Sequence, residues 1–295
     1  NDGTVGNDLV KYTCAHCGAE IITDRSTAAT VCVYCGNAVI MGEQIIDNFS
    51  PDYVIPFKVP KNQVMDAFQK FSKKPLTPKD FSCDRVVDKM QGVYIPFWLY
   101  SGNCEGSITA EGINTRTWTS GNYRYTEKKY YSVYRNGTLD FKAVPVDASS
   151  KTDDDAMDSI EPFDYSEMTA FNPGYLSGYL AERYDEDKDK CLPRAKERIE
   201  NTTRDELRNT CNYNSVNVQS YEKHTEIKDV KYAMLPTWLV YTTYQDKPYF
   251  FAMNGQTGKF IGNLPISKGK LVAYSLLGGV GGYIIGAILQ IMGIF

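Results

Sequence analysis

The chain has 295 residues, a hydrophobic content of 42%, a charged content of 23% and a formal net charge of −4. This length is enough for a small metal-binding module together with one or two domains that have cores of their own. The net negative charge argues against a protein that binds nucleic acid through a broad basic surface. An aromatic share of 13%, including 22 tyrosines, favours β-rich packing.

Four cysteines near the start form two matched Cys-x-x-Cys-Gly motifs, at Cys14, Cys17, Cys32 and Cys35. In such a motif two thiolates lie at a tight turn where glycine adopts a backbone conformation that other residues avoid. Two turns of this kind facing each other complete a tetrahedral shell of four sulfurs around zinc. The spacing therefore predicts one Zn2+ ion in a zinc ribbon over residues 8–45. The shell is closed and leaves no position for water, so the predicted site is structural.

Two other interpretations of these cysteines stay open. One is a pair of disulfides, although adjacent Cys-x-x-Cys partners rarely form relaxed bridges. The other is a redox pair, which would need a thioredoxin-like βαβ pattern that the sequence lacks. His16, inside the first motif, is expected to face solvent. The segment 8–47 carries five acids and two bases, the reverse of what phosphate binding requires.

Residues 50–268 are predicted to form an α+β body. It begins with a short strand at 53–59 and a helix that Asn62 caps and that runs to about Ser72. The Asn136-Gly137 pair predicts a hairpin turn, and the alternation of tyrosine with charged residues around it predicts a sheet with one wet face. The further strands are expected at 92–100, 106–112, 123–134, 139–144, 216–227, 232–244, 248–253 and 258–262.

A helical insert is predicted over residues 151–211, with one helical stretch at 174–184 and another at 194–209. Its acidic clusters, 153–155 and 185–187, are expected to be solvated helix ends rather than a cation site, because no loop of alternating oxygen ligands is present.

A weak internal repeat flanks this insert. The segment 93–100 is echoed by 233–241, since both contain a proline, a tryptophan two residues later, a leucine and a tyrosine. The repeat predicts two related strand-rich halves. The tryptophans are expected to pack in the core rather than to form a ligand platform.

The last 25 residues, 271–295, contain no charge. At about 1.5 Å per residue such a helix can cross a hydrocarbon core of about 30 Å, so the run predicts a transmembrane helix. Gly278, Gly282 and Gly286 recur every fourth residue, which favours pairing with a second copy or another helix, or only reflects how common glycine is in membrane helices. Lysines before the run place the preceding body in the cytoplasm.

Chemistry typical of enzymes is sparse. The chain has two histidines, and the second, His224, lies in a polar segment without a nucleophile motif. Neither a phosphate-binding loop nor a dinucleotide fingerprint occurs. The remaining cysteines are expected to be single thiols in a reducing compartment. Because the chain begins with Asn1 and shows no signal-peptide pattern, residues are expected to precede it.

The cysteine motifs, an Ile-Pro-Phe strand, a Tyr-Ile-Pro-Phe-Trp-Leu-Tyr strand, a tyrosine-rich segment at 175–184 and the glycine-rich tail together resemble a known family. These are bacterial membrane-anchored proteins described as containing a general-transcription-factor-type zinc ribbon, sometimes labelled primosomal helicase. The resemblance covers nearly the whole chain, implies zinc at the four cysteines and implies no established reaction. A helicase would need the phosphate-binding loop that this sequence lacks.

We therefore expect a non-enzymatic, membrane-anchored zinc-ribbon scaffold or adaptor that presents a protein-interaction surface in the cytoplasm. One alternative is a nucleic-acid-binding factor in transcription or replication, by analogy with other ribbons. Another is an unrecognised enzyme that depends on His224 or on the acidic insert.

Overall fold

The computed structural model describes residues 9–16, 18, 20–24, 27–31, 38–40, 50–81, 86 and 90–276. The chain divides into two compact units, which draw on different stretches of it. Unit 1 takes residues within 1–55, 94–153 and 165–235, and unit 2 takes residues within 56–93, 154–164 and 236–295.

Three long antiparallel strands dominate unit 1: β6 (Gln91–Ser120), β7 (Tyr123–Asp147) and β10 (Ser215–Tyr244), of which β6 and β10 also contribute to unit 2. The register of β6 with β7 runs from Phe97 opposite Asp147 to Ser120 opposite Tyr123, with one irregularity beside Gly102. The connecting turn is Gly121-Asn122, where Gly121 has a φ of 59°, a value that glycine adopts without strain.

The hairpin turn predicted at Asn136-Gly137 is wrong, because β7 continues straight through it. Gly137 lies opposite Gly106 in the ladder. A Cβ on Gly106 would come within 2.9 Å of the Thr203 side chain on helix α5 (Lys188–Asn209). Glycine at position 106 thus lets the helix approach the sheet, and the long-range pairing of β7 with β6 overrides the local turn propensity at Asn136-Gly137.

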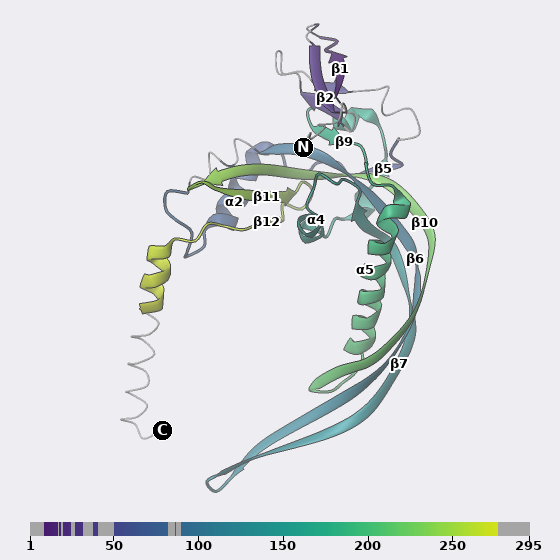
Figure 1. Ribbon diagram of the computed structural model, residues 1–295, viewed down its shortest axis with the longest axis vertical. Coiled ribbons are helices and arrows are strands. Elements are labelled where there is room, and N and C mark those ends of the chain that lie inside the picture. Colours follow the sequence, from purple (N-terminus) through teal and green to yellow (C-terminus); the bar gives the residue numbers. More distant parts are fainter. Residues whose placement is uncertain are drawn as a thin grey trace, which may run out of the picture. The chain divides into compact units, whose positions relative to one another are not determined.

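Helix α5 lies along the bend of the long strands, as Figure 1 shows. Its buried residues recur every fourth position, which makes one apolar face: Cys191, Ala195, Ile199, Thr203 and Leu207. Asp187 caps the helix, since its Oδ1 accepts hydrogen bonds from the backbone N–H of Asp189 at 3.0 Å and of Lys190 at 2.8 Å.

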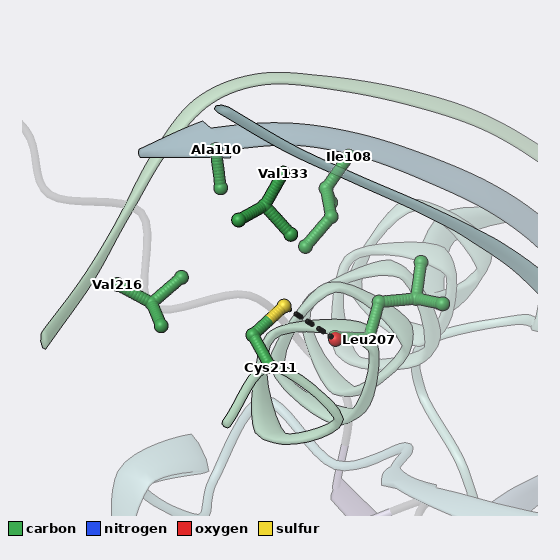
Figure 2. Close-up of a cluster of buried hydrophobic side chains, with 6 residues drawn as sticks. All are labelled: Ile108, Ala110, Val133, Leu207, Cys211 and Val216. Carbon is green, nitrogen blue, oxygen red and sulfur yellow. Dashed lines mark hydrogen bonds between the residues drawn. The ribbon is translucent and has the colours of Figure 1, made fainter. Parts of the chain in front are cut away.

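The end of α5 closes a small apolar core against the sheet (Figure 2). Leu207 and Cys211 contribute from the helix and the residues after it, and strands β6, β7 and β10 contribute the others: Ile108, Ala110, Val133 and Val216. Burial of these side chains holds the middle of the long hairpin in a fixed position.

The shorter elements of unit 1 are β1 (Leu9–Thr13), β2 (Glu20–Asp24), β3 (Thr27–Val31), β4 (Ala38–Ile40), β5 (Tyr53–Val54), η1 (Tyr165–Glu167), β8 (Thr169–Ala170), η2 (Pro173–Leu176) and β9 (Leu180–Glu182). Strands β1 and β2 form an antiparallel pair, and β10, β6, β9, β3 and β4 are neighbours in that order in one sheet. The helix predicted at 174–184 is wrong, because Gly178 has a φ of 87° and the chain after it becomes β9.

Unit 2 contains α2 (Lys61–Ser72), α4 (Asp154–Ile160), the end of β10, β11 (Lys247–Asn254) and β12 (Phe260–Gly262). The predicted pairing of the last two strands is confirmed, with Phe251 opposite Gly262 and Met253 opposite Phe260. The predicted cap at Asn62 is wrong, since α2 begins at Lys61 after Pro60, which makes no side-chain cap. Aromatic rings of α2 pack on this sheet, with Phe68 5.2 Å from Phe251 between ring centroids.

The two proline-tryptophan segments have matching local contacts. The carbonyl of Pro96 accepts from Ala148 N–H at 2.9 Å, and that of Pro236 accepts from Gly255 N–H at 2.8 Å. The indole N–H of Trp98 donates to the Glu186 carbonyl, and that of Trp238 donates to the Val59 carbonyl, both at 2.9 Å. Both tryptophans are buried, which confirms their predicted core role.

The fold class expected from the sequence is corrected. The structure is mostly β rather than α+β, since β6, β7 and β10 have 30, 25 and 30 residues and the helices are few. Among the described residues no helix is long and apolar enough to cross a membrane, so they do not contain the predicted transmembrane helix, of which residues 277–295 lie outside the description. The described chain also holds no group of three or more His, Cys, Asp or Glu residues able to hold a metal ion, and three of the four cysteines of the predicted zinc ribbon lie outside it.

Candidate interaction surface

The β6–β7 hairpin continues beyond the elements that cover the rest of it. Figure 1 shows this end of the hairpin extending past α5 and past the start of β10. Every residue from 115 to 132 is exposed. We call residues 115–132 the hairpin tip.

A pair of asparagines marks the base of the tip. Asn214, the residue before β10, accepts a hydrogen bond at Oδ1 from Thr115 N–H at 2.7 Å. Its own N–H donates to Asn114 Oδ1 at 3.2 Å. Next to them the Tyr213 ring packs on Tyr131 with centroids 5.2 Å apart. These contacts mark the last part of the hairpin that other elements cover. Beyond them the two strands pair only with each other in the described structure.

Aromatic side chains gather on the tip. Trp118 and Tyr125 lie opposite each other in the register and stack with ring centroids 5.6 Å apart and planes 14° apart. The Arg116 guanidinium lies 5.6 Å from the Trp118 ring centroid, within cation–π range. Side-chain exposure is unusually high for large aromatics at Trp118 (42%), Tyr123 (72%), Tyr125 (46%), Tyr130 (60%) and Tyr131 (40%).

The tip is basic although the whole chain is acidic. Residues 115–132 contain four bases and one acid, so their net charge is +3 against −4 for the chain. Lys129 lies 3.8 Å from the only acid, Glu127. Among the described residues the other three bases, Arg116, Arg124 and Lys128, have no ion pair. Exposed aromatic rings next to unneutralised bases are typical of a recognition surface.

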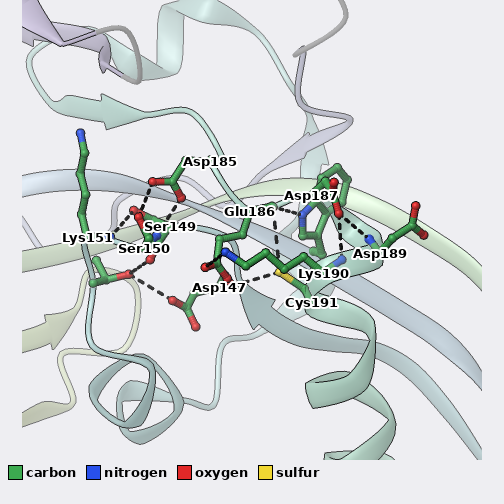
Figure 3. A network of polar contacts seen from close by, with 12 residues as sticks. Asp147, Ser149, Ser150, Lys151, Asp185, Glu186, Asp187, Asp189, Lys190 and Cys191 are labelled. Carbon is green, nitrogen blue, oxygen red and sulfur yellow. Dashed lines mark hydrogen bonds and ion pairs between the residues drawn. The ribbon is translucent and has the colours of Figure 1, made fainter. Parts of the chain in front are cut away.

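The acidic insert is used inside the protein instead. Figure 3 shows its polar network, in which Asp185 accepts from Ser150 N–H at 2.7 Å and from Ser150 Oγ at 2.6 Å. Asp187 caps α5, and Asp154 lies in the first turn of α4, which confirms for both the expected placement at helix ends. Asp185 and Asp187 thus bind backbone and hydroxyl groups of their own unit.

Asp147, at the end of β7, is the most deeply buried charge of that network. Its side chain is fully buried, and Oδ1 accepts from Arg194 Nη1 at 2.6 Å while Oδ2 accepts from Thr152 Oγ1 at 3.1 Å. Nearby, the Tyr100 hydroxyl donates to the Lys188 carbonyl at 2.6 Å, and burial raises the pKa of Tyr100. The network joins the start of α5 to the sheet.

The residues predicted to bind zinc are only partly described. Cys14 is buried, and its carbonyl accepts from Gly18 N–H at 2.8 Å. Gly18 has a φ of 72°, as the predicted tight turn requires. Cys17, Cys32 and Cys35 lie outside the described residues. Zinc at these four cysteines therefore stays a prediction.

The zinc prediction has a direct measurement. Protein purified under reducing conditions is expected to contain one zinc per chain by mass spectrometry of the metal, and Cys14→Ser is expected to lose it. The single thiol Cys104, which is buried between sheet and helix, provides the control as Cys104→Ser, which is expected to keep the metal. Protein without zinc would contradict the prediction.

The structure also places most of the other residues that the sequence singled out, namely the histidines and the single cysteines. His16 is exposed, as expected. His224 is exposed on β10. Cys104, Cys191 and Cys211 are buried free cysteines, which confirms single thiols at these positions. The glycines of the proposed helix-pairing face, Gly278, Gly282 and Gly286, lie outside the described residues.

The hairpin tip is not among the predicted sites. The concentration of basic and aromatic residues between 115 and 132 is visible in the sequence, but the turn is predicted at Asn136-Gly137, so residues 123–134 are expected in a sheet with one solvent-exposed face and residues 113–122 between two strands. In the structure both faces of the tip are exposed to solvent.

Comparison with known proteins gives a family but no activity. No protein-family model and no solved structure matches this chain. A protein of Bacillus subtilis strain 168, described as the uncharacterized protein YdjG, is 39% identical over 317 aligned positions, which cover 90% of this chain and 93% of the relative. The chain therefore belongs to the same family as YdjG of Bacillus subtilis.

Proposed function

We propose that this chain is a non-enzymatic scaffold or adaptor and that the hairpin tip is its protein-interaction surface. The observation that carries the proposal is the cluster of exposed aromatic rings and unneutralised bases at the end of a hairpin whose middle is fixed by a core. Tryptophan, tyrosine and arginine dominate the binding energy of protein interfaces because they combine large apolar area with directed polar groups.

The unfavourable exposure of aromatic surface at the tip supports the same proposal. Exposed aromatic surface is unfavourable in water, and a two-stranded hairpin without further cover is marginally stable. The Trp118–Tyr125 stack and the Arg116 contact hold the tip in shape. A surface ordered in advance loses less conformational entropy on binding than a flexible one.

The aromatic pair gives the test. Affinity capture from an extract of the source organism is expected to recover a partner with the intact protein. Trp118→Ala together with Tyr125→Ala should reduce that recovery by at least about tenfold, because central aromatic residues are binding hot spots. Tyr175→Ala, at an exposed tyrosine elsewhere in unit 1, is the matched control and is expected to leave recovery unchanged. Equal recovery by all three proteins would contradict the proposal.

Nucleic-acid binding is a second candidate, and the same basic and aromatic composition of the tip favours it. Single-stranded nucleic acid binds where bases stack on aromatic rings beside cationic side chains. The Trp118–Tyr125 pair argues against it in part, because each ring already covers one face of the other. Tight binding of an oligonucleotide with a steep dependence on salt would favour this candidate over the first.

A further inference from the structure

We propose that the tip binds an acidic segment of a partner protein in extended conformation, which adds as a new strand along the open edge of β7. This inference rests on the proposed function and deepens it by naming the chemistry of the partner. Three features of the tip carry it: an open strand edge, the direction of the backbone groups along that edge and an excess of positive charge.

Strand β7 has one open edge. Within the described structure it pairs with β6 and with no other strand. An open edge presents backbone N–H and C=O groups that can accept a further strand, and extended peptides commonly bind proteins in this way.

The register indicates which backbone groups face outward. Thr115 N–H points away from β7, because it donates to Asn214 beside β10. Backbone groups of successive residues in an antiparallel strand point alternately to its two edges, so the groups of Arg116 and Trp118 point toward β7. Their partners Glu127 and Tyr125 then point back toward β6.

The residues between these partners therefore offer their backbone groups to the open edge. They are Arg124, Thr126 and Lys128, with Tyr130 and Ser132 continuing the series. All five are exposed. A strand laid along this edge would meet an uninterrupted row of peptide groups with two cations beside it.

The positive charges of the tip favour an added strand that contains acidic residues. Opposite charges on neighbouring strands stabilise a sheet by about 0.2–1 kcal/mol per pair, and like charges directly opposite destabilise it. Arg124 and Lys128 have no ion pair among the described residues, and Lys129 has only the distant one with Glu127. Glutamate or aspartate on the added strand would supply the missing partners.

The same charges argue against a second copy of this chain as the occupant. Two tips edge to edge would bring +3 against +3, an arrangement that edge strands use to prevent self-association. The open row of backbone groups distinguishes a peptide ligand from a nucleic acid or an anionic membrane. A phosphate group uses only the charges, whereas an acidic peptide uses the charges and the row of backbone groups.

The experiment measures binding of a fluorescent peptide, Thr-Glu-Val-Glu-Thr-Glu-Val-Glu-Thr, to the full chain by anisotropy. Two further peptides separate charge from strand addition. In one, every glutamate is replaced by lysine. In the other, alternate amides are N-methylated, which leaves the charge and removes the hydrogen bonds of one edge. Oligothymidylate and vesicles of phosphatidylglycerol with phosphatidylcholine test the other anionic ligands.

A charge-reversed protein and a matched control complete the design. Arg124→Glu with Lys128→Glu is expected to weaken the acidic peptide at least tenfold and to bind the lysine peptide instead. Lys79→Glu with Lys228→Glu makes the same change in net charge at exposed lysines outside the tip and is expected to change binding less than twofold. The intact protein is expected to bind the N-methylated peptide at least tenfold more weakly than the unmodified one.

The inference is overturned if the acidic peptide does not bind, if both double variants lose it equally, or if the N-methylated peptide binds as well as the unmodified one. Tighter binding of oligothymidylate or of the anionic vesicles than of the peptide also overturns it. These failures are distinct from failure of the proposed function. If the Trp118→Ala and Tyr125→Ala protein loses its partner while no acidic peptide binds, the proposed interaction surface is supported and the acidic strand is rejected as its ligand.

Discussion

Replacing Arg194 by methionine is expected to lower the free energy of unfolding by about 3 kcal/mol, since it removes the cation that is hydrogen-bonded to a buried carboxylate. The partner is Asp147, whose side chain is fully buried and accepts from Arg194 Nη1 at 2.6 Å. After the replacement Thr152 remains as a hydrogen-bond donor to Asp147, but a hydroxyl does not neutralise a carboxylate. Methionine retains most of the apolar stem of arginine, so the loss reports mainly on charge.

Urea unfolding followed by circular dichroism measures the effect. Arg204→Met is the matched control on the same helix, because Arg204 pairs with Asp205 at 3.1 Å on the surface. Exposed pairs contribute less than about 1 kcal/mol, so this variant should unfold near the wild type. Adding Asp147→Asn to Arg194→Met is expected to restore part of the stability, since the neutral amide needs no counter-charge. Equal unfolding curves for the two arginine variants would contradict the role given to the Asp147 network.

The sequence predicted the buried parts of the strands better than their lengths. The core positions of Trp98 and Trp238 were expected, because apolar residues flank each proline-tryptophan pair. In the structure each indole N–H also donates to a backbone carbonyl. Breaks were expected at 101–105 and at Asn136-Gly137, which contain glycine and asparagine, and at the charged residues 228–231, yet β6, β7 and β10 run through these positions. At Gly106 the glycine makes room for the side chains of α5, which is a tertiary requirement that local turn chemistry does not reveal.

Within the helical insert, a helix was predicted where the structure has a strand. Its tyrosine-rich segment at 174–184 has apolar residues at helical spacing, yet Gly178 has a φ of 87° and the following residues form β9, which pairs with β3. Pairing with a strand distant in the sequence decided the outcome. The capping role of Asp187 was predictable, since an acid before a long helical pattern is a local signal that needs no partner.

The candidate site was not predictable from residue types alone. The basic and aromatic composition of residues 115–132 is plain in the sequence, but composition does not say whether a stretch of strand is covered. Coverage depends on where α5 ends and where β10 begins, and thus on the contacts of Asn214 and Tyr213 at the base of the tip. The cysteine motifs, by contrast, predict a metal from spacing alone, and that prediction awaits metal analysis.

A shortened hairpin tests whether the hairpin tip is the interaction surface of this protein. Deleting residues 117–126 and joining Arg116 to Glu127 through Gly-Asn keeps the native turn sequence, and it also keeps the register, because Arg116 and Glu127 are opposite each other and have the same hydrogen-bonding phase as Ser120 and Tyr123 at the native turn. The core of Ile108, Val133 and Leu207 is untouched. Since every deleted residue is exposed, the free energy of unfolding is expected to change by less than about 1 kcal/mol.

Affinity capture with this shortened protein, in parallel with the intact chain, is the decisive measurement. We expect the shortened protein to fold with an unchanged circular dichroism spectrum and to lose the partner that the intact chain recovers. Recovery of the same partners in the same amounts by a folded, shortened protein would contradict this expectation.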